Sequence, residues 1–188
     1  MFRAFQRAAV AAIAACLAAC GGAAPAGSAD NAIILTVTGE IGATNRGPLD
    51  EFQDAFLGHK GIKFDKAFEF SRASLNALGE HEVQIKRANW PVVVTLRGPR
   101  LKDVLAAVKA QGNTVVLTAL DGYESKFPMS GLQSDTVLLA TEADGKPLSI
   151  GGHGPVWLVF PAGAVPGDDA SGDAGLAWSI YHIAVVKE

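Results

Sequence analysis

Cysteine is scarce in this sequence: the 188 residues contain two, Cys16 and Cys20, both near the N-terminus. From residue 21 onward there is no thiol, which excludes a disulfide, a cysteine nucleophile and a thiolate metal ligand from that part of the chain. An excess of positive charge is also lacking, since 16 lysines and arginines stand against 19 acidic residues and give a net charge of −3. This balance excludes a generally basic nucleic-acid binder, and we expect no nucleic-acid partner.

The N-terminal apolar run is too short to cross a membrane. After Arg3 and Arg7, an uncharged, alanine-rich run extends from Ala8 to Ala19, whereas a membrane span needs about 20 predominantly apolar residues. Two cations followed by such a run are typical of a signal peptide, so we expect residues 1–19 to be removed. Their removal takes away two cations and no acidic residue, which makes the remaining chain more acidic.

The end of this run predicts a lipid anchor. Leu17-Ala18-Ala19-Cys20 resembles a bacterial lipobox, in which the cysteine is diacylated and becomes the new N-terminus. The alternative is an ordinary signal peptide cut after an Ala-x-Ala site, which leaves Cys20 as a free thiol. We therefore expect Cys20 to be lipidated and the protein to be a periplasm-facing lipoprotein of the bacterial cell envelope. Its contact with the membrane would be through the lipid anchor alone.

The rest of the chain has the composition of one globular domain. Hydrophobic residues make up 49% and charged residues 19% of the sequence, which excludes a largely disordered chain and a collagen-like chain. Residues 20–31 are mostly small and predict a flexible tether, and residues 32–188 are long enough for a stable core without disulfides. We expect a signal peptide at 1–19, a tether at 20–31 and a single domain at 32–188.

Apolar periodicity predicts strands and a few short helices. Helical spacing begins at Leu49, after Ser71 and at Leu101. Asp121-Gly122 is a strong hairpin signal because it favours positive φ, and Asp144-Gly145 predicts a further turn. Segments rich in β-branched residues or alternating in polarity predict strands at 33–38, 83–86, 92–96, 114–120, 123–127, 137–141, 156–160 and 178–186. Together these elements form an α+β domain with most of its strands in the second half.

No motif in the chain fixes a reaction. The four histidines lack paired metal-binding spacing, the glycine-rich segment at 151–154 matches no phosphate-binding loop, and no Gly-x-Ser-x-Gly is present. We therefore predict no catalytic and no metal-binding residues. The acidic loop with Asp168, Asp169, Ser171 and Asp173 is interpreted as a solvated loop and not as a calcium site. The three tryptophans, Trp90, Trp157 and Trp178, fit a core, and Trp178 is the best candidate for a pocket.

Several segments, in their order along the chain, resemble the oxidoreductase molybdopterin-binding domain of the sulfite oxidase superfamily, especially its short, stand-alone secreted members. The most telling is 152–161, which is similar to the stretch that enters the cofactor pocket with a His-Gly pair and leaves along a core strand. Trp178 and 183–185 resemble the closing strand, and further segments are 35–39, 64–67, 96–99, 104–105, 119–123, 138–140 and 144–148. The resemblance covers most of Ile33–Glu188 and implies the sulfite-oxidase-type fold, with mixed β-sheets and a few short helices.

Three departures from the family pattern bear on the cofactor. Catalytic members hold molybdenum with a cysteine thiolate, and this domain has none. Ala177 stands where relatives commonly have a lysine that meets the pterin phosphate. Relatives that carry the cofactor cross the membrane folded, through a twin-arginine signal, whereas Arg3 and Arg7 are not adjacent. The resemblance thus implies molybdopterin as the possible cofactor, and the departures favour a domain without it.

Two functions follow, and both stay open. In the favoured one, the protein is a non-catalytic binding or accessory module without molybdenum, whose cleft holds a small ligand or an envelope protein partner. In the other, it is a molybdopterin-dependent oxidoreductase with a non-cysteine metal environment; a purely structural envelope lipoprotein is a third, simpler possibility. The resemblance supplies the candidate cofactor- or ligand-binding residues, each of which also fits a structural role: Asn45, Arg97, Tyr123, His153 and Trp178.

Overall fold

The computed structural model describes residues 31–166, 168, 173 and 175–188. The expected signal peptide, Cys20 and nearly all of the expected tether lie outside these residues, as do Asp169 and Ser171 of the acidic loop. The described chain is mostly β-strand with a few short helices. None of the helices within it is both long and apolar enough to span a membrane.

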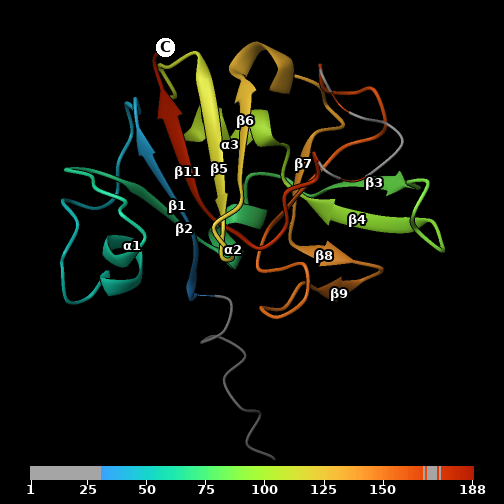
Figure 1. The fold of residues 1–188 in the computed structure, drawn as a ribbon, viewed down its shortest axis with the longest axis horizontal. Coiled ribbons are helices and arrows are strands. Elements are labelled where there is room, and N and C mark those ends of the chain that lie inside the picture. The colour runs from blue at the N-terminus through green and yellow to red at the C-terminus, as the bar shows by residue number, and fades with distance from the viewer. Residues whose placement is uncertain (1–30, 167, 169–172, 174) are drawn as a thin grey trace, which may run out of the picture.

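A five-stranded sheet forms one side of the molecule (Figure 1). Its strand order is β2-β1-β11-β5-β6, and the first and last strands of the domain are parallel neighbours, with Thr36 opposite His182 and Gly39 opposite Val185. All other pairs in this sheet are antiparallel. The strands are β1 (Ile33–Gly39), β2 (Phe68–Ser71), β5 (Thr114–Ala119), β6 (Glu124–Pro128) and β11 (Ile180–Val186).

Two smaller sheets form the other side. One has the order β3-β4-β8-β9 and the other pairs β7 with β10, all antiparallel. The predicted turn at Asp144-Gly145 is confirmed: it joins β8 to β9, and both residues have positive φ, 48° and 72°. The strands are β3 (His81–Ile85), β4 (Val94–Gly98), β7 (Leu138–Ala140), β8 (Glu142–Ala143), β9 (Lys146–Pro147) and β10 (Trp157–Val159).

Helix α2 (Arg72–Asn76) begins where the sequence predicts. The Ser71 hydroxyl accepts a hydrogen bond from the backbone N–H of Ser74, and the Ser74 hydroxyl accepts one from the backbone N–H of Ser71. Two N–H groups at the helix start are thereby satisfied by side chains. The remaining helices are α1 (Ala55–His59), α3 (Leu101–Ala107) and a 3-10 turn at Met129–Leu132.

The helix predicted from Leu49 is wrong in its first half, because α1 begins at Ala55. The Asp50 carboxylate accepts hydrogen bonds from the backbone N–H groups of Phe52 and Gln53, which holds this segment in a turn. Phe52, which the helical spacing from Leu49 includes, is 85% exposed.

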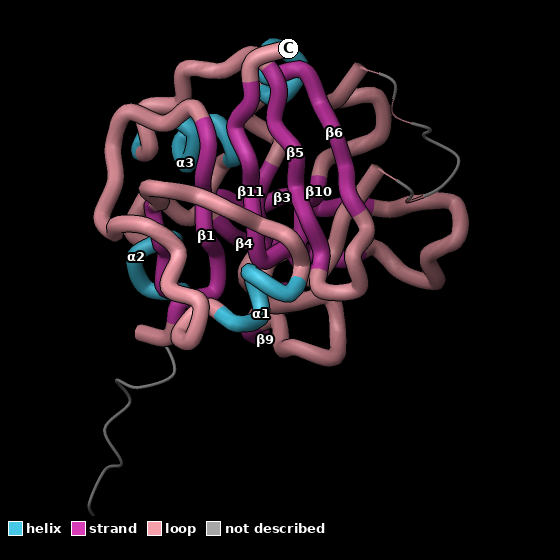
Figure 2. The backbone as a smooth tube through the Cα atoms, turned by 60° about the vertical axis from the view of Figure 1, so that its left-hand side comes forward, coloured by secondary structure: helices cyan, strands magenta, loops and turns pink. Residues whose placement is uncertain are grey.

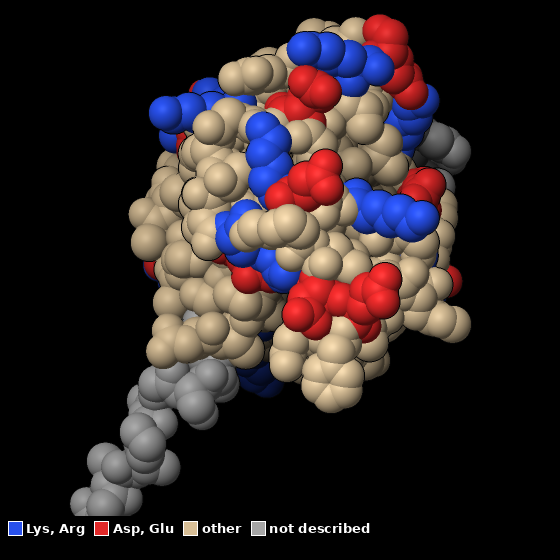
Figure 3. Space-filling model, turned by 90° about the vertical axis from the view of Figure 1, so that its left-hand side faces the viewer, with Lys and Arg blue, Asp and Glu red and all other residues tan. Residues whose placement is uncertain are grey.

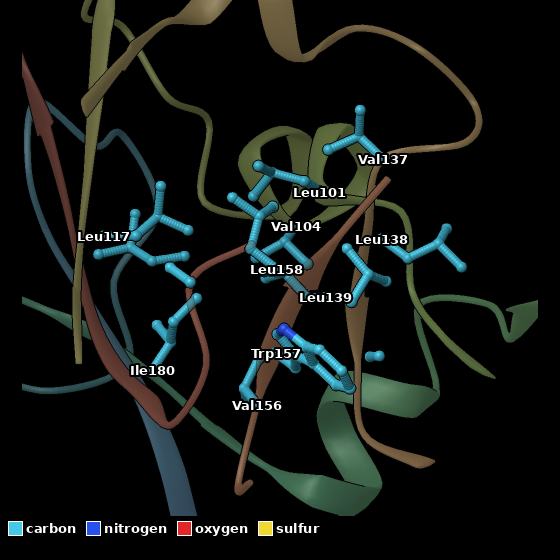
Figure 4. Packing of buried hydrophobic residues seen from close by; sticks show 14 of the residues in the cluster. Leu101, Val104, Leu117, Val137, Leu138, Leu139, Val156, Trp157, Leu158 and Ile180 are labelled. Carbon is cyan, nitrogen blue, oxygen red and sulfur yellow. The ribbon is translucent and has the colours of Figure 1, made fainter. Parts of the chain in front are cut away.

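Helix α3 supplies the centre of the core. Its Leu101 and Val104 are fully buried and point toward β7 and β10, with Leu117 of the five-stranded sheet on the other side (Figure 4). The tube in Figure 2 shows α3 behind the large sheet. The helix and the two-stranded sheet therefore fill the space next to the five-stranded sheet, and β10 is fixed in the middle of the protein.

Candidate functional site

Three of the five candidate residues line one pocket. Tyr123 follows the β5–β6 turn, His153 precedes β10, and Trp178 precedes β11. The pocket has a volume of about 420 Å³, and its other lining residues are Asp121, Trp157, Asp173 and Leu176. Residues from three distant parts of the sequence thus meet at one end of the five-stranded sheet.

Backbone hydrogen bonds join the three segments. The Ser179 N–H donates to the His153 carbonyl at 2.8 Å, and the Leu120 N–H donates to the Ser179 carbonyl at 3.0 Å. Ser179 has a positive φ of 56°, which interrupts extended backbone. The predicted last strand therefore begins at Ile180 and not at Trp178, and the Trp178 side chain is free of the sheet and faces the pocket.

Stacked rings form the fixed wall of the pocket. The His153 imidazole lies flat on the Trp157 indole, with ring centroids 4.1 Å apart and an interplanar angle of 9°. Trp157 is buried, and its Nε1–H donates to the Leu176 carbonyl at 3.1 Å. The Trp178 ring contacts His153, the other ring of the stack, with ring centroids 5.1 Å apart and an interplanar angle of 46°. Tyr123 and Trp178 are each about half exposed, so their rings remain accessible.

The charged groups that line the pocket are carboxylates. Trp90 Nε1–H donates to Asp173 Oδ2 at 3.2 Å, and this hydrogen bond is the main cause that lowers the pKa of Asp173. Asp121 Oδ1 accepts from the Tyr123 N–H at 2.9 Å. Burial lowers the pKa of His153, so the imidazole is neutral at neutral pH.

No lysine or arginine is among the described residues that line the pocket. Several cations lie nearby: Lys60 near Gly122, Lys86, whose ammonium donates to the Trp90 carbonyl, and Arg87, which is fully buried and pairs with Asp168 at 3.0 Å. The charge of Arg87 also contributes to the lowered pKa of Asp173. None of the three lines the pocket. The whole stretch 147–186, which supplies most of the lining, contains no lysine or arginine. The pocket is therefore aromatic and negatively charged.

The other two candidates lie elsewhere. The Asn45 amide makes two hydrogen bonds with the backbone of Glu69, both 2.8 Å, and thereby fixes a loop to β2. Arg97 lies on β4, with half of its side chain exposed, and pairs with Glu80 at 3.1 Å and Glu142 at 3.9 Å. Neither lines the pocket of Tyr123, His153 and Trp178.

Sequence reasoning missed Asp121, Trp157 and Asp173 as lining residues. The sequence pattern places Asp121 in a turn, Trp157 in the core and Asp173 in a solvated loop. For Trp157 and Asp173, the available signal is the absence of lysine and arginine over 147–186; Asp121 lies outside this stretch. Among the described residues, no three His, Cys, Asp or Glu side chains are grouped so that they could hold a metal ion.

One known protein family matches most of the chain. The model of a family described as "Oxidoreductase molybdopterin binding domain" matches residues 31–165, which is more than half of the chain. The match includes Tyr123, His153 and Trp157 of the pocket and ends before Trp178. No curated protein matches the chain.

Proposed function

The chain belongs to the oxidoreductase molybdopterin-binding domain family, and we propose that it is an exported, lipid-anchored member that acts as a non-catalytic binding module. Its pocket at His153 and Trp178 holds a small ligand or part of an envelope protein partner in place of molybdopterin. The observation that carries this proposal is the set of chemical groups in the pocket.

Molybdopterin is an anion that brings molybdenum, and the residues present do not fit it. The lining presents the carboxylates of Asp121 and Asp173 and the neutral imidazole of His153. A phosphate next to two carboxylates is repelled, and the cysteine thiolate with which catalytic members hold molybdenum is absent from the sequence after Cys20. Ala177, in the position where a lysine is common in relatives, is 1% exposed and belongs to the core.

Export and anchoring rest on the N-terminal sequence. Arg3 and Arg7 precede an alanine-rich run that ends in Leu17-Ala18-Ala19-Cys20, and about a dozen small or polar residues then lead to β1. The domain begins with β1 at one end of the molecule (Figure 1). Because β1 and β11 are parallel, β1 begins at the same end of the five-stranded sheet as the pocket residue Trp178. On the face in Figure 3, positive and negative side chains are interspersed.

The test is the cofactor content of the mature protein, extracted in mild detergent from its native envelope. Molybdenum is measured by elemental analysis and pterin by the fluorescence of its oxidised form, with a cysteine-containing catalytic family member extracted in the same way as the positive control. We expect both contents to be far below one per chain. Near-stoichiometric molybdenum and pterin would establish a molybdopterin-dependent oxidoreductase and overturn the binding module.

A further inference from the structure

The pocket has the chemistry of a receptor for positive charge. From its aromatic walls and its two carboxylates, we propose that it binds an organic cation with an alkylated ammonium head group. This inference rests on the proposed function, because it assumes a pocket that is not filled by molybdopterin.

The aromatic rings at the pocket offer a surface that attracts a cation. A cation over the face of an aromatic ring is attracted by the ring's quadrupole, and tryptophan is the strongest partner. The rings of Tyr123 and Trp178 each remain about half exposed at the pocket. The His153–Trp157 stack is held by burial and by the bond from Trp157 Nε1–H to the Leu176 carbonyl. The wall is therefore formed before a ligand arrives, which lowers the ordering cost of binding.

The carboxylates of the pocket also favour a cation. Asp173 is held by the indole of Trp90, and Asp121 is held by the backbone N–H of Tyr123. Asp173 stays ionised at neutral pH because its pKa is lowered, and neutral His153 adds no opposing charge. Two negative charges with aromatic faces between them favour a cation and repel an anion.

The size and shape of the pocket suit a small organic cation. A pocket of about 420 Å³ lies at the lower end of the range for small-molecule sites, about 300–1,000 Å³. A neighbouring hollow of about 270 Å³ shares Asp121 and Trp178 and is otherwise lined by Leu120, Gly151, Gly152 and Ser179. The head group therefore fits the aromatic pocket while a short polar tail extends past Trp178 over the glycine backbone.

An alkylated ammonium is favoured over a primary one. A primary ammonium has three N–H donors, each of which needs a hydrogen-bond acceptor. The side chains of the lining offer acceptors at the two carboxylates, whereas most of the remaining surface is aromatic. Methyl groups instead pack on the rings and spread the charge over a larger surface. The carbon isostere of choline, 3,3-dimethylbutan-1-ol, has the same shape without the charge and is the matched probe.

The experiment is calorimetric titration of the mature, detergent-solubilised protein with choline, 3,3-dimethylbutan-1-ol and ethanolamine. We expect saturable binding of choline and at least tenfold weaker binding of the neutral isostere and of the primary amine. Trp178→Leu and Asp121→Asn should each weaken choline binding about five- to tenfold. Phe52→Leu and Asp135→Asn change residues that are 85% exposed and 68% exposed in the side chain, respectively, outside the pocket, and should leave it unchanged.

One further arm separates a free cation from a lipid head group. Glycerophosphocholine carries the same ammonium with a phosphate, which Asp121 and Asp173 should repel, so we expect it to bind more weakly than choline. Tighter binding of glycerophosphocholine would instead assign the same ammonium chemistry to a lipid head group.

Two results would overturn the inference: equal binding of choline and its neutral isostere, or no binding of choline to a protein shown to be folded by circular dichroism. Failure of the cation proposal is distinct from failure of the proposed function. A protein without molybdenum and pterin that ignores choline remains a binding module for another ligand. A protein that contains both is a cofactor enzyme whatever choline does.

Discussion

The Thr38 hydroxyl and Nε2 of His182 lie 2.8 Å apart between the parallel strands β1 and β11. His182 is 4% exposed, and its Nδ1 has no hydrogen-bond partner among the described residues. Burial disfavours the charged imidazole and lowers the pKa of His182 to about 4. The first and last strands of the domain are thus joined by a histidine that is neutral in the folded protein.

Stability is expected to fall as the pH falls from about 6.5 to about 4. In this range the unfolded chain protonates His182 while the folded chain does not, so protons favour the unfolded state. The full loss from this one residue is about 3 kcal/mol. Urea unfolding at pH 7, 5.5 and 4 should show a smaller loss for His182→Gln than for the wild type. The control variant His59→Gln, at an exposed site, should lose as much stability between pH 7 and pH 4 as the wild type. An equal loss of stability in all three proteins would contradict the role of His182.

Arg87 and Asp168 form a buried ion pair near the pocket. Arg87 and Asp168 have side chains that are 0% and 1% exposed, and Arg87 also donates to the Phe160 carbonyl at 3.0 Å. Asp168→Ala should cost about 3–5 kcal/mol, because it leaves the guanidinium buried without its carboxylate. Arg87→Met combined with Asp168→Leu should recover much of this loss. Chemical denaturation measures both, with Asp135→Ala at an exposed pair as the control. A double variant no more stable than Asp168→Ala would refute this explanation.

Gly98 allows two sheets to approach each other. A Cβ at this residue would lie 2.2 Å from the Leu139 carbonyl oxygen of β7, a backbone atom that cannot move alone. Gly98→Ala should therefore destabilise the protein by about 2 kcal/mol or more. Gly58→Ala is the control, since its Cβ meets only the Leu49 side chain at 3.9 Å and the residue lies in α1. That variant should be neutral or slightly stabilising. Equal melting temperatures for the two variants would contradict the prediction.

Lipidation is expected to depend on Cys20. In a bacterial host fed labelled palmitate, the wild-type chain should take up label and partition into the membrane fraction. Cys20→Ala should abolish both, whereas Cys16→Ala should leave both intact because that residue is removed with the signal peptide. Label retained in Cys20→Ala would point to another attachment.

Local signals explain the elements that the sequence predicts well. Ser71 caps α2, Asp121-Gly122 and Asp144-Gly145 make their turns, and the spacing of Leu101, Val104 and Leu105 places α3. Each depends on atoms within a few residues, so composition and spacing carry the information. The early start predicted for α1 failed because Asp50 bonds its own backbone neighbours, a competing local pattern.

The sequence by itself determined most of the strands, the turns, the absence of a thiolate after Cys20 and the absence of cations over 147–186, but it did not predict β2, β8 and β9. Only the tertiary structure decided that Asp121, His153 and Trp178 share one pocket while Asn45 and Arg97 do not line it. The reason is that these positions are joined by long-range backbone pairing, in which Ser179 bonds both His153 and Leu120. Such pairing depends on which strands become neighbours, and no local pattern encodes that.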